Sequence, residues 1–188
     1  MRIIAGEFRG RKLLSPESDL TRPITDRVKQ SLFDIVAPDL PGSTVYDCFA
    51  GTGSMGLESL SRGALRTVFF ESDRSAILRL KQNIAILEVQ DQAQVLAGDL
   101  FKWFAMARPT ADLKCNIIFL DPPYRFVVEK SELIRTLLTQ MFEHHLKPGG
   151  YVVFRHESRG NLMFADAEEF DLREYGGMKL RFLRARSN

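Results

Sequence analysis

The sequence predicts an α/β protein with a mostly parallel sheet that is covered by helices on both faces. Short apolar runs rich in β-branched and aromatic residues alternate with helical patterns over residues 44–154. The runs are continuously apolar, which is typical of strands buried on both faces. With 188 residues, 45% of them hydrophobic, the chain can bury a sizeable core, so we expect a single domain over residues 1–188.

The first 40 residues are expected to form an extension to this core. In residues 1–16, apolar pairs flank two glycines, which predicts a small β-hairpin. Residues 21–40 carry apolar residues at helical spacing up to Pro38, which predicts a helix that ends there. We therefore divide the domain into an N-terminal part, residues 1–40, and a core, residues 41–188.

The core elements follow in a regular order. Strands are predicted over residues 44–49, 67–71, 93–98, 116–121 and 151–154. Helices are predicted between them, over residues 54–63, 74–87, 100–107 and 132–146. Two strand-like segments then flank Gly176 and Gly177, which predicts an antiparallel hairpin at the end of the chain.

The composition argues against a secreted, membrane-spanning or metal-binding protein. Cys48 and Cys115 lie in apolar runs, so we expect buried reduced thiols and no metal site. No apolar run reaches the ~20 residues of a membrane span, and no signal-peptide pattern opens the chain. These features lead us to expect a cytoplasmic protein.

Basic residues gather at both ends of a chain whose formal net charge is only +2. Residues 1–14 hold Arg2, Arg9, Arg11 and Lys12 against one acid, and residues 173–188 hold five cations against one acid. Such ends suit a polyanion, although charge alone favours the simpler interpretation of solvated surface residues.

Four consecutive predicted strands each end in an acid. These acids are Asp47, Glu71, Asp99 and Asp121. In an open α/β sheet, ligands bind beyond the carboxyl ends of the strands. We therefore expect a binding site along this edge of the sheet.

A glycine pattern, G-x-G-x-x-G, follows the first of these acids at Gly51, Gly53 and Gly56. It is the dinucleotide-binding fingerprint, and Glu71, 20 positions after Gly51, suits the hydroxyl groups of a ribose. However, Asp47 directly before the loop would repel a pyrophosphate. S-adenosylmethionine suits an acidic site better than NAD, because it carries positively charged ammonium and sulfonium groups and no pyrophosphate.

The motif D-P-P-Y, Asp121 to Tyr124, gives the strongest chemical signal. The two prolines fix φ and direct the Asp121 carboxylate and the Pro122 carbonyl at one point. Both groups are hydrogen-bond acceptors, so that point suits an NH₂ group, and Tyr124 can stack on a flat ring. We infer a holder for the exocyclic amine of a nucleobase, kept in line with a methyl donor.

The segments RGRKL, TRPITDRVKQSLFDIV, DCFAGTGSMGLESLSRGA and FLDPPY, in this order, resemble one family. That family is the bacterial small-subunit ribosomal RNA guanine N2-methyltransferases, or RsmD-like enzymes. The resemblance implies the Rossmann-like S-adenosylmethionine-dependent methyltransferase fold, a seven-stranded, mostly parallel sheet with a reversed last strand. It also implies methylation of N2 of a specific guanine in 16S rRNA. Because 188 residues with two small basic patches suggest modest affinity for RNA, we expect the substrate to be an assembled or partly assembled subunit. We also expect the protein to be a monomer.

The resemblance further implies which residues form the site. Cofactor binding falls to Thr21, Arg22, Pro23, Thr25, Asp47, Ala50, Gly51, Thr52, Gly53, Glu71, Ser72, Asp99 and Leu100. The target guanine falls to the catalytic set Asp121, Pro122, Pro123 and Tyr124, and RNA contact to Arg9, Arg11 and Lys12. One departure is visible, because Arg155 stands before His156 where the family often has an acid. We interpret His156 as a structural histidine rather than a general base.

Three rival functions remain open at this stage. A DNA adenine or protein glutamine N-methyltransferase uses a similar Asx-Pro-Pro-aromatic loop. An NAD-dependent oxidoreductase would use the glycine pattern. An RNA-binding ribosome assembly factor would keep the fold without turnover, although the intact Asp121 argues against it.

Overall fold

The computed structural model describes residues 1–16, 24–157 and 164–186. Its contacts divide the chain into two compact units, residues 1–98 and residues 99–188, and each unit is described separately. Within the described ranges, none of the helices combines the length and the apolar character needed to cross a bilayer.

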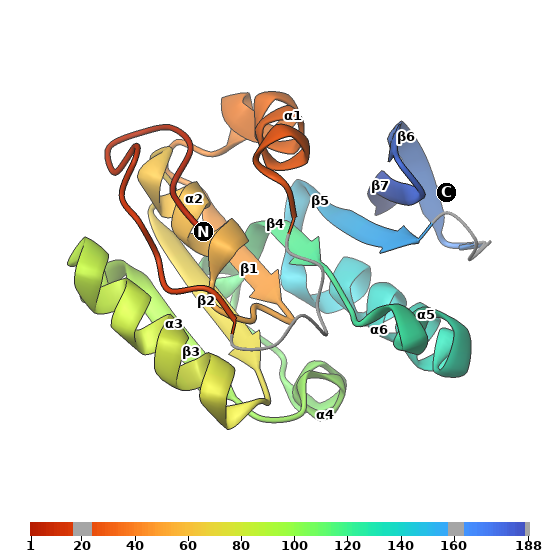
Figure 1. The fold of residues 1–188 in the computed structure, drawn as a ribbon. Helices are drawn as coiled ribbons and strands as arrows, with labels where there is room; N and C mark the ends of the chain where they lie inside the picture. Colours follow the sequence, from red (N-terminus) through yellow and green to blue (C-terminus); the bar gives the residue numbers. More distant parts are fainter. Residues whose placement is uncertain (17–23, 158–163, 187–188) are drawn as a thin grey trace. The chain divides into compact units, whose positions relative to one another are not determined.

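Three parallel strands form the sheet of the first unit in the order β3-β2-β1 (Figure 1). Their bounds are Thr44–Cys48 for β1, Arg66–Glu71 for β2 and Ala93–Ala97 for β3. Every residue of β1 and the four central residues of β2 are buried. Both faces of these two strands are therefore covered, as their continuous apolar runs predicted.

The helices of the first unit follow the predicted pattern closely. They are α1 (Asp26–Val36), η1 (Ala37–Asp39), α2 (Ser54–Ser61), α3 (Arg74–Leu87) and η2 (Gln90–Gln92). Thr25 caps α1 by accepting a hydrogen bond from the Val28 amide at 3.4 Å, and the α-helix ends two residues before Pro38. Helix α2 packs on β1 and β2, while α3 packs on β3.

The predicted N-terminal hairpin is only partly present, because it contains one antiparallel bridge, between Arg2 and Lys12, and no regular strands. The reason is that its backbone binds to α2. The amides of Ile4 and Ala5 donate to the Glu58 carboxylate at 2.8 and 3.0 Å. Amides held by a side chain of another element cannot also form a hairpin ladder.

Four strands form the sheet of the second unit in the order β4-β5-β7-β6 (Figure 1). Their bounds are β4 Cys115–Leu120, β5 Leu146–Glu157, β6 Ala167–Tyr175 and β7 Met178–Ala185. Strand β5 is parallel to β4, whereas β7 is antiparallel to both β5 and β6. The last strand is therefore reversed, as predicted. The turn that reverses it contains Gly176 and Gly177 at φ 52° and 93°, values that glycine adopts without strain.

The helices of the second unit differ from the prediction in one region. They are α4 (Leu100–Met106), η3 (Ala111–Leu113), α5 (Tyr124–Glu129), α6 (Ser131–Gln140) and a π-helical turn, η4 (Met141–His145). Helix α5 was not predicted, and β5 begins at Leu146 rather than at residue 151. Both cysteines are buried, as expected.

Candidate active site

The glycine loop of the first unit connects β1 to α2 through left-handed backbone conformations. Phe49, Gly51 and Gly53 have φ values of 60°, 55° and 87°. A Cβ atom on Gly53 would lie 2.4 Å from Leu80 Cδ1, whereas a Cβ on Gly51 would meet no described atom within 4 Å. Gly53 therefore serves close packing, while Gly51 leaves open space above the loop.

Asp47 lies beneath this loop rather than above it. Its side chain is buried, and Oδ2 accepts a hydrogen bond from the Gly56 amide at 2.8 Å, which joins the end of β1 to the first turn of α2. Ala50 and Thr52 are also buried, and the Ala50 amide donates to the Phe70 carbonyl at 3.0 Å. The predicted loop residues are thus together, with Asp47 holding the loop from below.

Glu71, at the end of β2, is brought to the glycine loop as the sequence predicted. Oε2 accepts a hydrogen bond from the Gly51 amide at 2.7 Å. Oε1 accepts from the amides of Ser72 at 2.7 Å and Asp73 at 2.8 Å. These bonds fix one carboxylate beside the open space above Gly51.

The remaining predicted residues of the first unit lie in the N-terminal segment. Thr25 caps α1, whereas Thr21, Arg22 and Pro23 lie outside the described residues.

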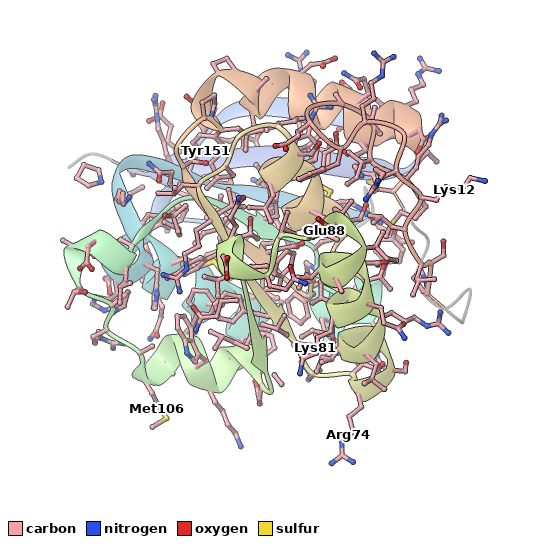
Figure 2. The ribbon with its side chains drawn as sticks, turned by 90° about the vertical axis from the view of Figure 1, so that its left-hand side faces the viewer. Lys12, Arg74, Lys81, Glu88, Met106 and Tyr151 are labelled. Atoms are coloured by element: carbon pink, nitrogen blue, oxygen red, sulfur yellow. The ribbon has the colours of Figure 1, made fainter. Side chains whose placement is uncertain are left out.

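Arg9, Arg11 and Lys12, the cations predicted to contact RNA, are all exposed. Lys12 extends away from the ribbon, as does Arg74 of α3 (Figure 2). One cation has a contact within the chain, because Arg11 Nη2 donates to the Ile86 carbonyl of α3 at 2.8 Å. The segment therefore presents cations from a backbone that is anchored to α2 and α3.

In the second unit, Asp99 and Leu100 form the start of α4. Asp99 is the N-cap, and Oδ1 accepts hydrogen bonds from the amides of Phe101 at 2.9 Å and Lys102 at 3.4 Å. Leu100 is buried.

The DPPY motif spans the end of β4 and the start of α5. Strand β4 ends at Leu120, Pro123 is the residue that caps α5, and Tyr124 is the first residue of that helix. Pro122 is buried, and the Asp121 side chain is 28% exposed. Burial raises the pKa of Asp121 above its ordinary value, and the charge of Arg155 opposes that rise.

Arg155 of β5 contacts both ends of this motif. Nη1 donates to Asp121 Oδ2 at 2.9 Å, and Nη2 donates to the Tyr124 hydroxyl at 3.4 Å. The sequence singled out Arg155 only as a departure from the resembled family. The register gives the signal that sequence reasoning missed, because Phe154 pairs with Leu120 and the next residues along both strands are Arg155 and Asp121.

His156 is buried, in agreement with its interpretation as a structural histidine. Its ring stacks on Phe154 with centroids 4.8 Å apart, and Nδ1 lies 2.7 Å from the Glu157 carbonyl oxygen. Burial lowers the pKa of this imidazole, which favours the neutral form.

An aromatic and cationic group beside the motif was also missed by the sequence analysis. Lys130 Nζ lies 3.9 Å from the ring centroid of Phe126 and 5.9 Å from that of Phe101. Phe101 belongs to α4 and Phe126 to α5, so the contact depends on how these two helices pack.

Solved structures define the class of protein to which this fold belongs. A candidate methyltransferase of Escherichia coli, yhhF, matches with a TM-score of 0.85 at 30% identity, covering 100% of this chain and 99% of that chain. A candidate methylase of Haemophilus influenzae, HI0767, matches with a TM-score of 0.77 at 30% identity, covering 99% and 98%. The chain has the Rossmann-like α/β fold of methyltransferases, and the predicted fold class is confirmed.

The chain belongs to the family described as conserved hypothetical protein 95, whose model matches residues 1–184. YlbH of Bacillus subtilis, named as a candidate rRNA methyltransferase, is 35% identical over 92% of this chain and 95% of that protein. The ribosomal RNA small subunit methyltransferase D of Haemophilus influenzae is 35% identical over 84% and 79% of the two chains. The Escherichia coli protein of the same name is 41% identical, with the match covering 66% of this chain and 61% of that protein. The RsmD-like family predicted from the motifs is confirmed.

Proposed function

We propose that this protein is an S-adenosylmethionine-dependent methyltransferase that methylates N2 of a guanine in 16S rRNA of the small ribosomal subunit. The observation that carries the proposal is the DPPY motif, held at the end of β4 with Asp121 partly exposed. The relatives named ribosomal RNA small subunit methyltransferase D support the class of substrate.

The residues of the first unit fit the proposed cofactor. Gly51 has open space above it, and the fixed Glu71 carboxylate beside that space can accept one further hydrogen bond, from a ribose hydroxyl group. S-adenosylmethionine supplies a methyl group activated by the sulfonium. The chain would hold this cofactor with Glu71 and the backbone of residues 50–53, while buried Asp47 keeps the loop in shape. The cofactor roles of Thr21, Arg22, Pro23, Thr25, Ser72, Asp99 and Leu100 stay predictions.

The residues of the DPPY motif would act on the target amine. An ionised Asp121 accepts one N–H hydrogen bond of the amine, and the Pro122 carbonyl accepts the other. The amine is a weak nucleophile because its lone pair is delocalised into the ring, and two acceptors shift electron density back to nitrogen. Pro123 fixes the loop and Tyr124 stacks on the base, so the amine is oriented before reaction. A base within a duplex must first be unpaired.

Contact with RNA is proposed for the exposed cations of the N-terminal segment, Arg9, Arg11 and Lys12. Three cations neutralise few phosphates, so binding should be weak and salt-sensitive on naked RNA. We therefore propose that the substrate is an assembled or partly assembled subunit, methylated in the cytoplasm by a monomer.

The test measures methyl transfer from labelled S-adenosylmethionine to small subunits purified from a strain that lacks the enzyme. Wild-type protein should label the rRNA, and digestion of that RNA should yield N2-methylguanosine. Asp121→Ala should abolish labelling while the protein stays folded. Asp112→Ala, which removes an exposed acid of the same unit, is the matched control and should retain activity. Retained turnover in Asp121→Ala would overturn the role given to this carboxylate.

Protein methylation is the second candidate, because ribosomal protein L11 methyltransferase of Haemophilus ducreyi is 30% identical over 47% of this chain and 33% of that enzyme. The same labelled particles distinguish the two substrates. Label that follows the protein fraction after phenol extraction, and leaves the RNA unlabelled, would replace the rRNA proposal.

A further inference from the structure

Arg155 connects the first and the last residue of the DPPY motif through one guanidinium group. Its two terminal nitrogens donate to Asp121 Oδ2 at 2.9 Å and to the Tyr124 hydroxyl at 3.4 Å. The planar guanidinium fixes the directions of its donors, which a flexible ammonium does not. The contact therefore constrains the orientation of the carboxylate and of the phenol together.

The sheet fixes the backbone from which Arg155 reaches this motif. Its neighbour Phe154 pairs with Leu120 of β4, and Arg155 itself pairs with Leu180 of β7. Strand β5 is thus paired on both sides, and the Arg155 side chain is only 10% exposed. An ion pair shielded to this degree is screened less than a surface pair and is geometrically better defined.

The geometry points to Arg155 as a positioning residue for the proposed reaction: it holds Asp121 Oδ2 and the Tyr124 hydroxyl so that Asp121 Oδ1 is presented to the target amine. This inference rests on the proposed function. The prolines restrict the backbone of the motif, but they do not restrict the side-chain torsions of Asp121, and the ion pair supplies that restriction.

The same contact favours the protonation state that the proposed role requires. Only an ionised carboxylate offers acceptors alone, because a protonated one carries a donor. Burial raises the pKa of Asp121, and Arg155 opposes that rise. Within the second unit, Arg155 on β5 is the charge that acts on Asp121, and Tyr124 is the other titratable group of the motif. Lys179 and Arg181 on β7 act on His156 instead.

The first experiment needs no methyl transfer and measures the titration of the Asp121 carboxyl by ¹³C NMR, assigned by comparison with Asp121→Asn. Arg155→Gln keeps a hydrogen-bond donor but removes the charge, so the pKa of Asp121 should rise relative to wild type. Arg155→Lys keeps the charge and should stay near the wild-type titration. An Asp121 titration that is the same in Arg155→Gln and wild type overturns the inference.

The second experiment measures methyl transfer to small subunits as a function of pH. Arg155→Gln should lower kcat on the order of tenfold or more, since small displacements of a positioned group carry such effects. Its acid limb should move to higher pH, while the KM for S-adenosylmethionine stays unchanged. Arg155→Lys should restore the position of the acid limb. Arg181→Gln is the matched control, because it removes an ion pair with Glu169 on the neighbouring hairpin.

The outcomes separate this inference from the function on which it rests. If wild-type protein labels no substrate, yet the Asp121 titration moves in Arg155→Gln, the proposed function fails and the positioning contact stands. If wild-type protein is active and Arg155→Gln matches it in kcat and pH profile, the inference fails and the function stands. An equal fall in kcat for Arg155→Gln and Arg181→Gln, without a shifted acid limb, would reduce Arg155 to a structural residue.

Discussion

The carboxylate of Glu58 accepts hydrogen bonds from two backbone amides and two basic side chains, and its replacement by glutamine gives a sharp stability prediction. Four donors converge on its two oxygens. Oε2 accepts from the Ile4 amide at 2.8 Å and from Lys29 Nζ at 2.9 Å. Oε1 accepts from the Ala5 amide at 3.0 Å and from Arg62 Nε at 2.9 Å. Glu58 is fully buried and Lys29 is 2% exposed.

The size of the effect follows from counting lone pairs. A carboxylate accepts about four hydrogen bonds, so Glu58 is saturated, whereas the glutamine side chain offers one acceptor oxygen and an NH₂ group that must face donors. At least two of the four donors then lose their partner. Glu58→Gln therefore leaves either the buried Lys29 ammonium or a backbone amide without its partner. Breaking a buried ion pair such as Lys29–Glu58 costs about 3–5 kcal/mol.

Thermal unfolding followed by circular dichroism measures this effect directly. For a chain of this size, about 3–5 kcal/mol corresponds to a fall in Tm of roughly 6–20 °C. Asp26→Asn is the matched control on α1, because the Arg2–Asp26 pair is exposed (63% and 53%) and should contribute below about 1 kcal/mol. Lys29→Met combined with Glu58→Gln should recover part of the loss, because the unpaired ammonium is removed. Glu58→Gln melting within about 2 °C of Asp26→Asn would refute the reasoning.

Four further predictions concern pH, packing at Gly56, the glycine loop at Gly51 and the carboxylate of Glu71. Burial lowers the pKa of His145 from 6.5 to about 4, so the unfolded state binds its proton first as the pH falls. The free energy of unfolding should therefore decline by up to roughly 3 kcal/mol between pH 6.5 and 4. In urea titrations, His145→Phe should flatten that decline and the adjacent control His144→Asn should not; equal slopes in both variants contradict the assignment. A Cβ on Gly56 would lie 2.3 Å from a buried phenylalanine ring of β2, so Gly56→Ala should lower stability by about 1–3 kcal/mol. A Cβ on Gly51 would enter open space at φ 55°, so Gly51→Ala should lower stability by about 1 kcal/mol. The same change should weaken the binding of S-adenosylhomocysteine, measured by calorimetry. An unchanged affinity would show that this loop does not bind the cofactor. Glu71→Gln should lower the same affinity at least about tenfold, because one amide oxygen cannot replace a carboxylate that accepts three backbone amides and, under the proposed function, a ribose hydroxyl.

The fold was predictable wherever local pattern decides structure. Continuous apolar runs identified the buried strands, and Gly176 with Gly177 identified the antiparallel hairpin at the end of the chain, because turn geometry depends on the residues of the turn itself. The N-terminal hairpin was predicted by the same local reasoning and was largely wrong. The amides of Ile4 and Ala5 donate to Glu58, more than 50 positions away, and no local pattern carries that information.

The region after the DPPY motif shows a second limit of sequence reasoning. The pattern over residues 132–146 was interpreted as one helix, but α6 ends at Gln140 and a π-helical turn follows. The turn carries His145 into contact with Trp103 and Phe104 of α4, at centroid distances of 5.2 and 4.5 Å. Packing of this turn against α4 thus overrides the helical spacing of apolar residues, and such packing is visible only in the tertiary structure.

Sequence reasoning predicted where the candidate acids lie along the chain but not what they contact. Glu71 is the last residue of β2, and Asp121 directly follows β4, as their strand-end positions predicted. The partners of these acids are the Gly51 amide, 20 positions from Glu71, and the Arg155 guanidinium, 34 positions from Asp121. Contacts of this kind depend on how distant strands pair, so predicting them requires the strand register as well as the motif.

Two acids of this chain, each beside an arginine, differ in how much of their hydrogen-bonding capacity the protein itself uses. Glu58 is fully buried and spends its two oxygens on four donors of the protein, so it has no capacity left for a ligand. Asp121 is 28% exposed, and Arg155 Nη1 donates to Oδ2, so under the proposed function the other oxygen is the one available to a substrate. Removing the first carboxylate should therefore change the melting temperature, and removing the second should change methyl transfer with little change in melting. If Asp121→Ala unfolded the protein as Glu58→Gln is expected to, the partly exposed carboxylate would have to be counted as structural, and the role of Arg155 would change with it.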